Sequence, residues 1–103
     1  MAGYTVIEDW QSVEARYVLD VTIRKTEDDK YPSGWDYSLH LGKVGGDTVL
    51  RYDNAHERTK GHERHTRGEV EYIDFPGMLD LYDRFEAEAR ELTPDEWNWP
   101  KSV

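Results

Sequence analysis

The side chains best suited to chemistry lie in one short stretch near the middle of the chain. Three of the four histidines, His56, His62 and His65, fall within ten consecutive positions. Arg51 and Asp53 come just before them. Histidine transfers protons near neutral pH, and the planar arginine fork suits phosphate. The stretch is therefore a place where an anion, a metal or a proton could be handled.

The charge of this stretch is opposite to that of the chain around it. Positions 51–67 hold five basic and three acidic side chains, whereas the whole chain has 13 Lys and Arg, 22 Asp and Glu and a net charge of −9. Such a charge disfavours non-specific binding to nucleic acid or to an anionic membrane. Screening confines charge effects to about 8–10 Å, so a local phosphate site is still feasible.

Metal-independent cleavage of RNA is one interpretation of this pattern. It needs a base for the 2′-hydroxyl, an acid for the leaving oxygen, and cations for the phosphate oxygens. We predict that a loop after residue 53 brings these groups together in one cleft. The candidate catalytic residues are His56, His62, His65, Arg51 and Asp53.

A metal site and a solvated loop are the other interpretations. Asp53 or Glu63 could complete a ligand set with the histidines, but their spacing matches no zinc signature. Nearby cations would also oppose a metal ion, so no metal and no other cofactor is predicted. His40 lies on the polar face of its predicted strand and is interpreted as a surface or structural histidine, unless that face looks toward the loop.

The surrounding pattern predicts the elements that must position these residues. Strict alternation over 15–24 indicates a strand, and 35–41, 48–52 and 70–73 are further strands. Apolar residues at helical spacing from Met78 to Ala89 predict an amphipathic helix, and 93–96 a short terminal turn. We expect an α+β fold: an antiparallel sheet of about four strands with a C-terminal amphipathic helix packed on one face. Residues 1–103 form a single domain.

Composition excludes several classes of protein. With no cysteine, the chain can form neither a disulfide nor a thiolate zinc site. No basic region followed by an apolar run begins the sequence, and no apolar stretch approaches the length of a membrane span. The prediction is a cytoplasmic protein that does not associate with membranes.

The run Arg51-Tyr52-Asp53-Asn54-Ala55-His56, followed by His62 and His65, resembles the TumE-like toxins of prokaryotic toxin–antitoxin systems. The likeness extends over roughly 17–92. It implies a small cytoplasmic toxin whose partner is a cognate antitoxin, usually a helix-turn-helix protein. The family often has a denser His/Lys run near His62, which leaves open which histidine is the acid and which the base.

Two functions follow from these observations. The chain is either a toxin that acts as a metal-independent ribonuclease on RNA, or a non-catalytic binding module whose loop contacts an antitoxin or a nucleotide. The edges of a small sheet also favour pairing with another chain, either the antitoxin or a second copy in a homodimer.

Overall fold

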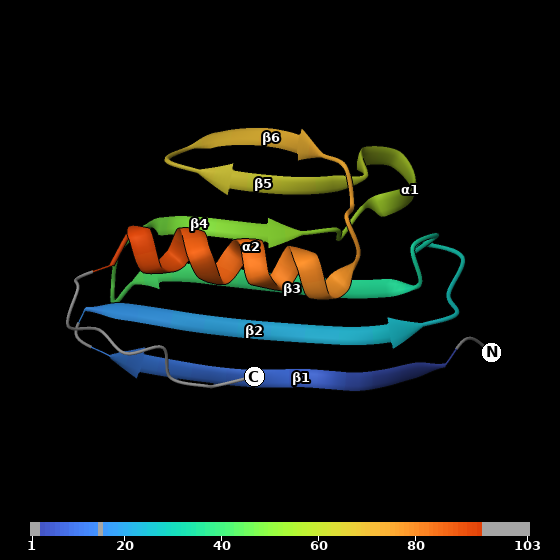
Figure 1. Cartoon of the computed structure of the whole chain (residues 1–103), viewed down its shortest axis with the longest axis horizontal. Coiled ribbons are helices and arrows are strands. Elements are labelled where there is room, and N and C mark those ends of the chain that lie inside the picture. The colour runs from blue at the N-terminus through green and yellow to red at the C-terminus, as the bar shows by residue number, and fades with distance from the viewer. Residues whose placement is uncertain (1–2, 15, 94–103) are drawn as a thin grey trace.

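The fold is a single antiparallel sheet with one long helix on one of its faces (Figure 1). The computed structural model describes residues 3–14 and 16–93. The strands are β1 (Tyr4–Glu14), β2 (Tyr17–Thr26), β3 (Trp35–Lys43), β4 (Thr48–Asp53), β5 (His62–Thr66) and β6 (Glu69–Ile73). The helices are α1 (Glu57–Lys60) and α2 (Met78–Glu91).

The strands pair in chain order, β1 to β6, and every pairing is antiparallel. The α+β class, the antiparallel sheet and the C-terminal helix are confirmed. The number of strands is wrong, because the sheet has six strands rather than about four. The predicted terminal turn at 93–96 lies largely outside the described residues.

The two additional strands have sequences without a regular apolar alternation. β1 mixes exposed apolar and polar side chains at the edge of the sheet. β5 reads His-Glu-Arg-His-Thr and contains no apolar residue at all. It forms a strand because β4 and β6 pair with it on both sides. The segment predicted as a histidine loop is therefore α1 followed by a central part of the sheet.

The core lies between α2 and one face of the sheet. Leu19, Val21 and Ile23 of β2 are buried as predicted, against the helix that bears Tyr82 and Phe85, while Tyr17 is half-buried. Phe85 meets the ring of Tyr52 edge to face, with centroids 5.9 Å apart. The Tyr52 hydroxyl donates a hydrogen bond to Glu88, which also pairs with Arg64 of β5. These contacts fasten α2 to the middle of the sheet.

Among the described residues, no helix covers the opposite face of the sheet. Cross-strand partners share a face, so the register identifies the side chains on it. Across β3, β4 and β5 one row consists of His40, Arg51 and His65, and the next row of Ser38, Asp53 and Glu63. We call this surface the helix-free face. It holds two of the four histidines and the Arg51–Asp53 pair.

Candidate active site on the helix-free face

β4 separates the residues of the Arg-Tyr-Asp-Asn motif by the alternation of a strand. Tyr52 points into the core and is fully buried, whereas Arg51 and Asp53 lie on the helix-free face. Asn54 follows the strand and is also fully buried. The motif thus provides two structural side chains and two side chains that are available for chemistry.

Arg51, Asp53, Glu63 and His65 form one polar cluster. His65 Nε2 lies 3.1 Å from Glu63 Oε1 and 3.3 Å from Asp53 Oδ2. Arg51 Nε donates to the same Asp53 oxygen at 2.7 Å, and the backbone N–H of Ala55 donates to the other oxygen at 3.3 Å. The Asp53 carboxylate is only 7% exposed, while the Arg51 side chain is 42% exposed. Asp53 therefore anchors both the arginine and the histidine.

This arrangement determines which atoms of His65 and Arg51 can meet a ligand. The carboxylates occupy the Nε2 side of the His65 ring, and within residues 3–14 and 16–93 no hydrogen bond is made to Nδ1. Asp53 occupies Nε of Arg51, which leaves the two terminal nitrogens of the guanidinium for a phosphate. A carboxylate that holds a histidine ring is a common way to orient a proton-transfer group.

A shallow pocket of about 170 Å³ opens beside this cluster. Its wall includes Arg51, His65, Arg67, Thr48 and Thr66. Arg67 lies in the tight β5–β6 turn with φ +49°, followed by Gly68 with φ +80°. Positive φ at both positions is typical of a two-residue hairpin turn whose backbone twist matches that of the two strands it joins. The turn brings a second arginine to the pocket, so its wall holds two arginines, one histidine and one carboxylate, that of Glu69.

The structure does not bring the three predicted histidines together. His62 and His65 are three positions apart on one strand, so they point to opposite faces of the sheet. His62 lies on the side of α2, only 8% exposed, and its ring stacks on Phe75 with centroids 4.5 Å apart. His56 is exposed at the start of α1, where its side chain makes no capping bond. The prediction of a single cleft containing all three histidines is wrong.

His62 belongs to a buried chain of hydrogen bonds that fastens the turn after β4. Its Nδ1 lies 2.8 Å from the Tyr37 hydroxyl, and its Nε2 faces Glu57 Oε2 at 3.6 Å. The Ser33 hydroxyl donates to Glu57 at 2.7 Å and the Asn54 amide donates at 2.9 Å. Burial raises the pKa of Tyr37, with a further contribution from the charges of Asp53 and Glu57. The phenol therefore stays neutral and can donate to His62.

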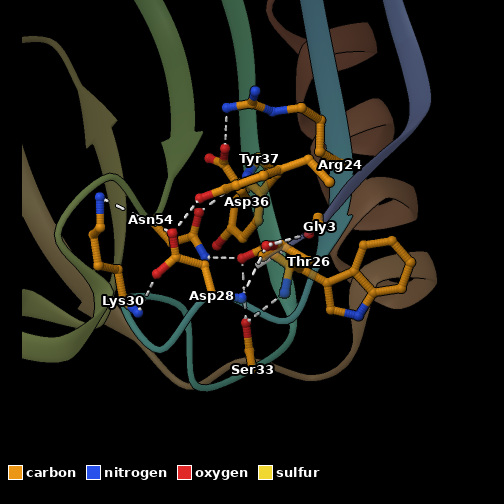
Figure 2. Close-up of polar contacts among 11 residues, drawn as sticks. Gly3, Arg24, Thr26, Asp28, Lys30, Ser33, Asp36, Tyr37 and Asn54 are labelled. Carbon is orange, nitrogen blue, oxygen red and sulfur yellow. Dashed lines mark hydrogen bonds and ion pairs between the residues drawn. The ribbon is translucent and has the colours of Figure 1, made fainter. Parts of the chain in front are cut away.

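Asn54 connects this chain to the start of β3. Its side-chain oxygen accepts a hydrogen bond from the backbone N–H of Tyr37 at 3.0 Å, and its amide donates to the carbonyl of Trp35 at 2.6 Å. Figure 2 shows Asn54 and Tyr37 beside the loop that contains Ser33. The role of Asn54 is structural, because all of these partners belong to the scaffold.

The protonation of His62 should make stability depend on pH. Burial lowers the pKa of His62 below its ordinary value of 6.5, and Glu57 offsets this only in part. The unfolded chain then binds the proton more readily than the folded one, so the free energy of unfolding falls as pH drops below about 6.5. We expect thermal melting at pH 5.5 to show a smaller loss, relative to pH 7.5, in His62→Gln than in the wild type. Equal losses in the two proteins would contradict this assignment.

A divalent metal is the other occupant that this cluster could accept. Asp53, Glu63 and His65 each offer one donor atom, and the three atoms lie within 4.8 Å of one another. Arg51, however, already supplies a positive charge to the Asp53 oxygen nearest His65. A metal ion would have to displace that guanidinium. The arrangement therefore fits a site in which arginine provides the positive charge.

Sequence reasoning undervalued one residue of this surface. The sequence predicts a surface or structural histidine at position 40 unless its face looks toward the loop, and in the structure that face also holds Arg51 and His65. The alternation of β3 already placed His40 on the polar face. The register that sets it opposite Arg51 depends on an irregularity between Leu41 and Gly42, which cannot be counted from the sequence.

The fold and the site define a small α+β domain with a basic pocket and an oriented histidine on an open sheet face. A comparison with protein-family models matched residues 5–93 to the family described as Toxin TumE. The chain belongs to this toxin family, which supports a role as the toxin of a toxin–antitoxin system and suggests a cognate antitoxin as partner. Neither the curated proteins nor the solved structures gave a match. No described helix is long and apolar enough to cross a membrane.

Proposed function

We propose that this toxin is a metal-independent endoribonuclease whose site is the pocket formed by Arg51, His65 and Arg67. The observation that supports it best is the geometry of His65. Two carboxylates occupy its Nε2 side, and its ring lines a pocket shared with two arginines. The histidine transfers a proton, and the arginines bind the phosphate and offset the charge that develops in the transition state.

The overall charge of the chain is compatible with this proposal. The net charge of −9 weakens binding to nucleic acid at a distance. The pocket is a local exception, because two arginines, Arg51 and Arg67, line it beside a single acidic residue, Glu69. We therefore expect selective action on a short exposed RNA segment rather than tight binding along a duplex.

The direct test is incubation of the purified protein with RNA in the presence of a chelator. Cleavage that persists with the chelator is the expected result, since arginine supplies the positive charge. Cleavage restored only by added zinc or manganese would instead identify Asp53, Glu63 and His65 as metal ligands. An absence of cleavage under all conditions, together with binding of antitoxin or nucleotide at the same pocket, would favour the non-catalytic binding module.

The antitoxin is proposed to bind at the β1 end of the sheet. β1 is an edge strand of 11 residues, and such edges invite pairing with another chain. Beside it lies an apolar groove of about 470 Å³ whose lining includes the exposed side chains of Ile7 and Leu79. A helix-turn-helix antitoxin with a basic surface would complement the acidic charge of this chain. A homodimer through the same edge is the competing assembly.

Co-expression with the protein encoded by the neighbouring gene tests this proposal. We expect the two proteins to elute as one complex, and Ile7→Asp to weaken it without lowering the melting temperature. Val44→Asp is the matched control, because Val44 is similarly exposed but lies in the β3–β4 turn. Elution of the toxin as a lone monomer would contradict both assemblies, and elution as a dimer without the neighbour would favour the homodimer.

A further inference from the structure

His40 lies in the same cross-strand row as the proposed site, on the far side of Arg51 from His65. Arg51 of β4 pairs with His40 of β3 on one side and with His65 of β5 on the other. Adjacent strands are about 4.8 Å apart, so the backbones at the two histidines are separated by roughly 10 Å, with Arg51 at the position between them. Side chains that lean inward over such a gap can reach opposite sides of one phosphate group.

An irregularity of the sheet brings Thr48, a residue of the pocket wall, to the His40 ring. The register between β3 and β4 shifts after Leu41, so that Thr48 pairs with Gly42 and Val49 packs against the core. This bulge places Thr48 on the helix-free face, where its hydroxyl lies 2.9 Å from His40 Nε2. Thr48 also lines the pocket that contains Arg51 and His65. Nε2 is therefore joined to the pocket wall through the Thr48 hydroxyl, and bulges often re-aim side chains in this way next to active sites.

Gly42 makes room for this position of the ring. A Cβ atom at residue 42 would lie 3.0 Å from the Cε1 atom of His40, closer than ordinary packing allows. Gly42 is buried even though it lies on the helix-free face. The backbone therefore leaves space for the ring to lie along its own strand and reach Thr48.

We propose that His40 is the general base of an RNA-cleaving site in which His65 is the general acid, with Arg51 holding the phosphate between them. The inference rests on the proposed ribonuclease function and adds a second proton-transfer residue and a product. His40 Nε2 takes the proton from the 2′-hydroxyl, and the oxygen forms a bond to phosphorus. The bond from phosphorus to the 5′-oxygen breaks, and His65 protonates that oxygen. The products are a 2′,3′-cyclic phosphate and a 5′-hydroxyl.

The charged groups around the two rings support the assignment of His40 as the base and His65 as the acid. His40 faces Arg51 and Asp20 across its two neighbouring strands. Burial, with the positive charge of Arg51, lowers the pKa of His40 despite the opposing effect of Asp20. The ring is therefore neutral near pH 7, as a base must be. His65 faces the carboxylates of Asp53 and Glu63, which orient its ring. The two rings therefore have different charged neighbours, with Arg51 beside His40 and two carboxylates on His65.

The mechanism requires the 2′-hydroxyl, which defines the substrate class as RNA. An oligonucleotide with a single ribonucleotide in a DNA chain should be cut only after that ribonucleotide. Replacing its 2′-hydroxyl by 2′-deoxy should abolish cleavage. The fragments should end in a cyclic phosphate and a 5′-hydroxyl, and fragments ending in a 5′-phosphate would overturn the mechanism.

The leaving group distinguishes the base from the acid. A uridine 3′-phosphate ester of p-nitrophenol needs a base but no acid, because p-nitrophenolate leaves without a proton. We expect His40→Gln to lower the rate by about 10²–10⁴-fold on both RNA and this ester. His65→Gln should lose a similar factor on RNA but recover most of it on the ester. The opposite pattern, or an unchanged rate in His40→Gln on RNA, would overturn the assignment.

Two controls separate this inference from folding effects and from the proposed function itself. Thr22→Ala changes the same face on β2, away from the pocket residues, and should leave both rates unchanged. Melting of each variant shows whether the fold is retained, and His40→Ala provides a second variant if His40→Gln is unstable. A wild type that does not cleave RNA would contradict the proposed function. A wild type that cleaves RNA together with a fully active, folded His40→Gln would contradict this inference alone.

Discussion

Replacement of His65 by alanine is expected to lower RNA cleavage, and the growth arrest that depends on it, by about 10²–10⁴-fold. The stability of the protein should change little. His65 lies on the helix-free face, opposite the face that packs on α2, and its side chain is 25% exposed. Its ring is oriented by two carboxylates, and alanine removes the only group proposed to protonate the leaving oxygen. Cleavage rates measured beside thermal melting would test both parts of this prediction.

The matched control for this substitution is Arg90→Ala. Arg90 is an exposed cation near the end of α2, on the other side of the sheet from the pocket, and pairs with Glu86. Its loss should leave both cleavage and melting near the wild-type values. Arg67→Ala should fall between the two, because it removes one phosphate contact and retains the proton transfer. Full cleavage activity in His65→Ala would exclude this pocket as the catalytic site.

Replacement of His62 by alanine, unlike that of His65, should cause a large loss of stability. We expect the free energy of unfolding to fall by about 2–4 kcal/mol. The substitution leaves the buried Tyr37 hydroxyl without its partner, removes the group facing the Glu57 carboxylate, and deletes the ring stacked on Phe75. Chemical denaturation of the variant and the wild type measures this difference directly.

A second substitution, Tyr37→Phe, separates the contribution of the hydrogen bond from that of the ring of His62. Tyr37→Phe removes the same hydrogen bond from the other end but keeps the aromatic ring, so it should cost less than His62→Ala. In both variants the residual RNA cleavage should follow the folded fraction. A His62→Ala protein that melts like the wild type but no longer cleaves RNA would show that His62 belongs to the catalytic site after all.

The elements with strong periodicity, and the segment that contains the candidate site, can be predicted from the order of the residues alone. β2 and β3 alternate between apolar and polar residues, and α2 has apolar residues at helical spacing: Met78, Tyr82, Phe85 and Ala89. Both patterns arise because one face of each element is buried, and the order of the residues shows this directly. The family motif from Arg51 to His56 was also visible as residue types in order. These patterns involve residues that are close in the sequence, so they can be recognised without the tertiary structure.

The side of the sheet that each functional residue occupies depends on how the strands pair. β5 has no apolar alternation, and its strand conformation comes from pairing with β4 and β6. Once it is a strand, the three-residue spacing sends His62 into the core and His65 to the helix-free face, because side chains alternate. The bulge at β4 then brings Thr48 to His40, in the same row as Arg51. Contacts between strands set this register, and they depend on residues distant in sequence, so neither composition nor local spacing contains that information.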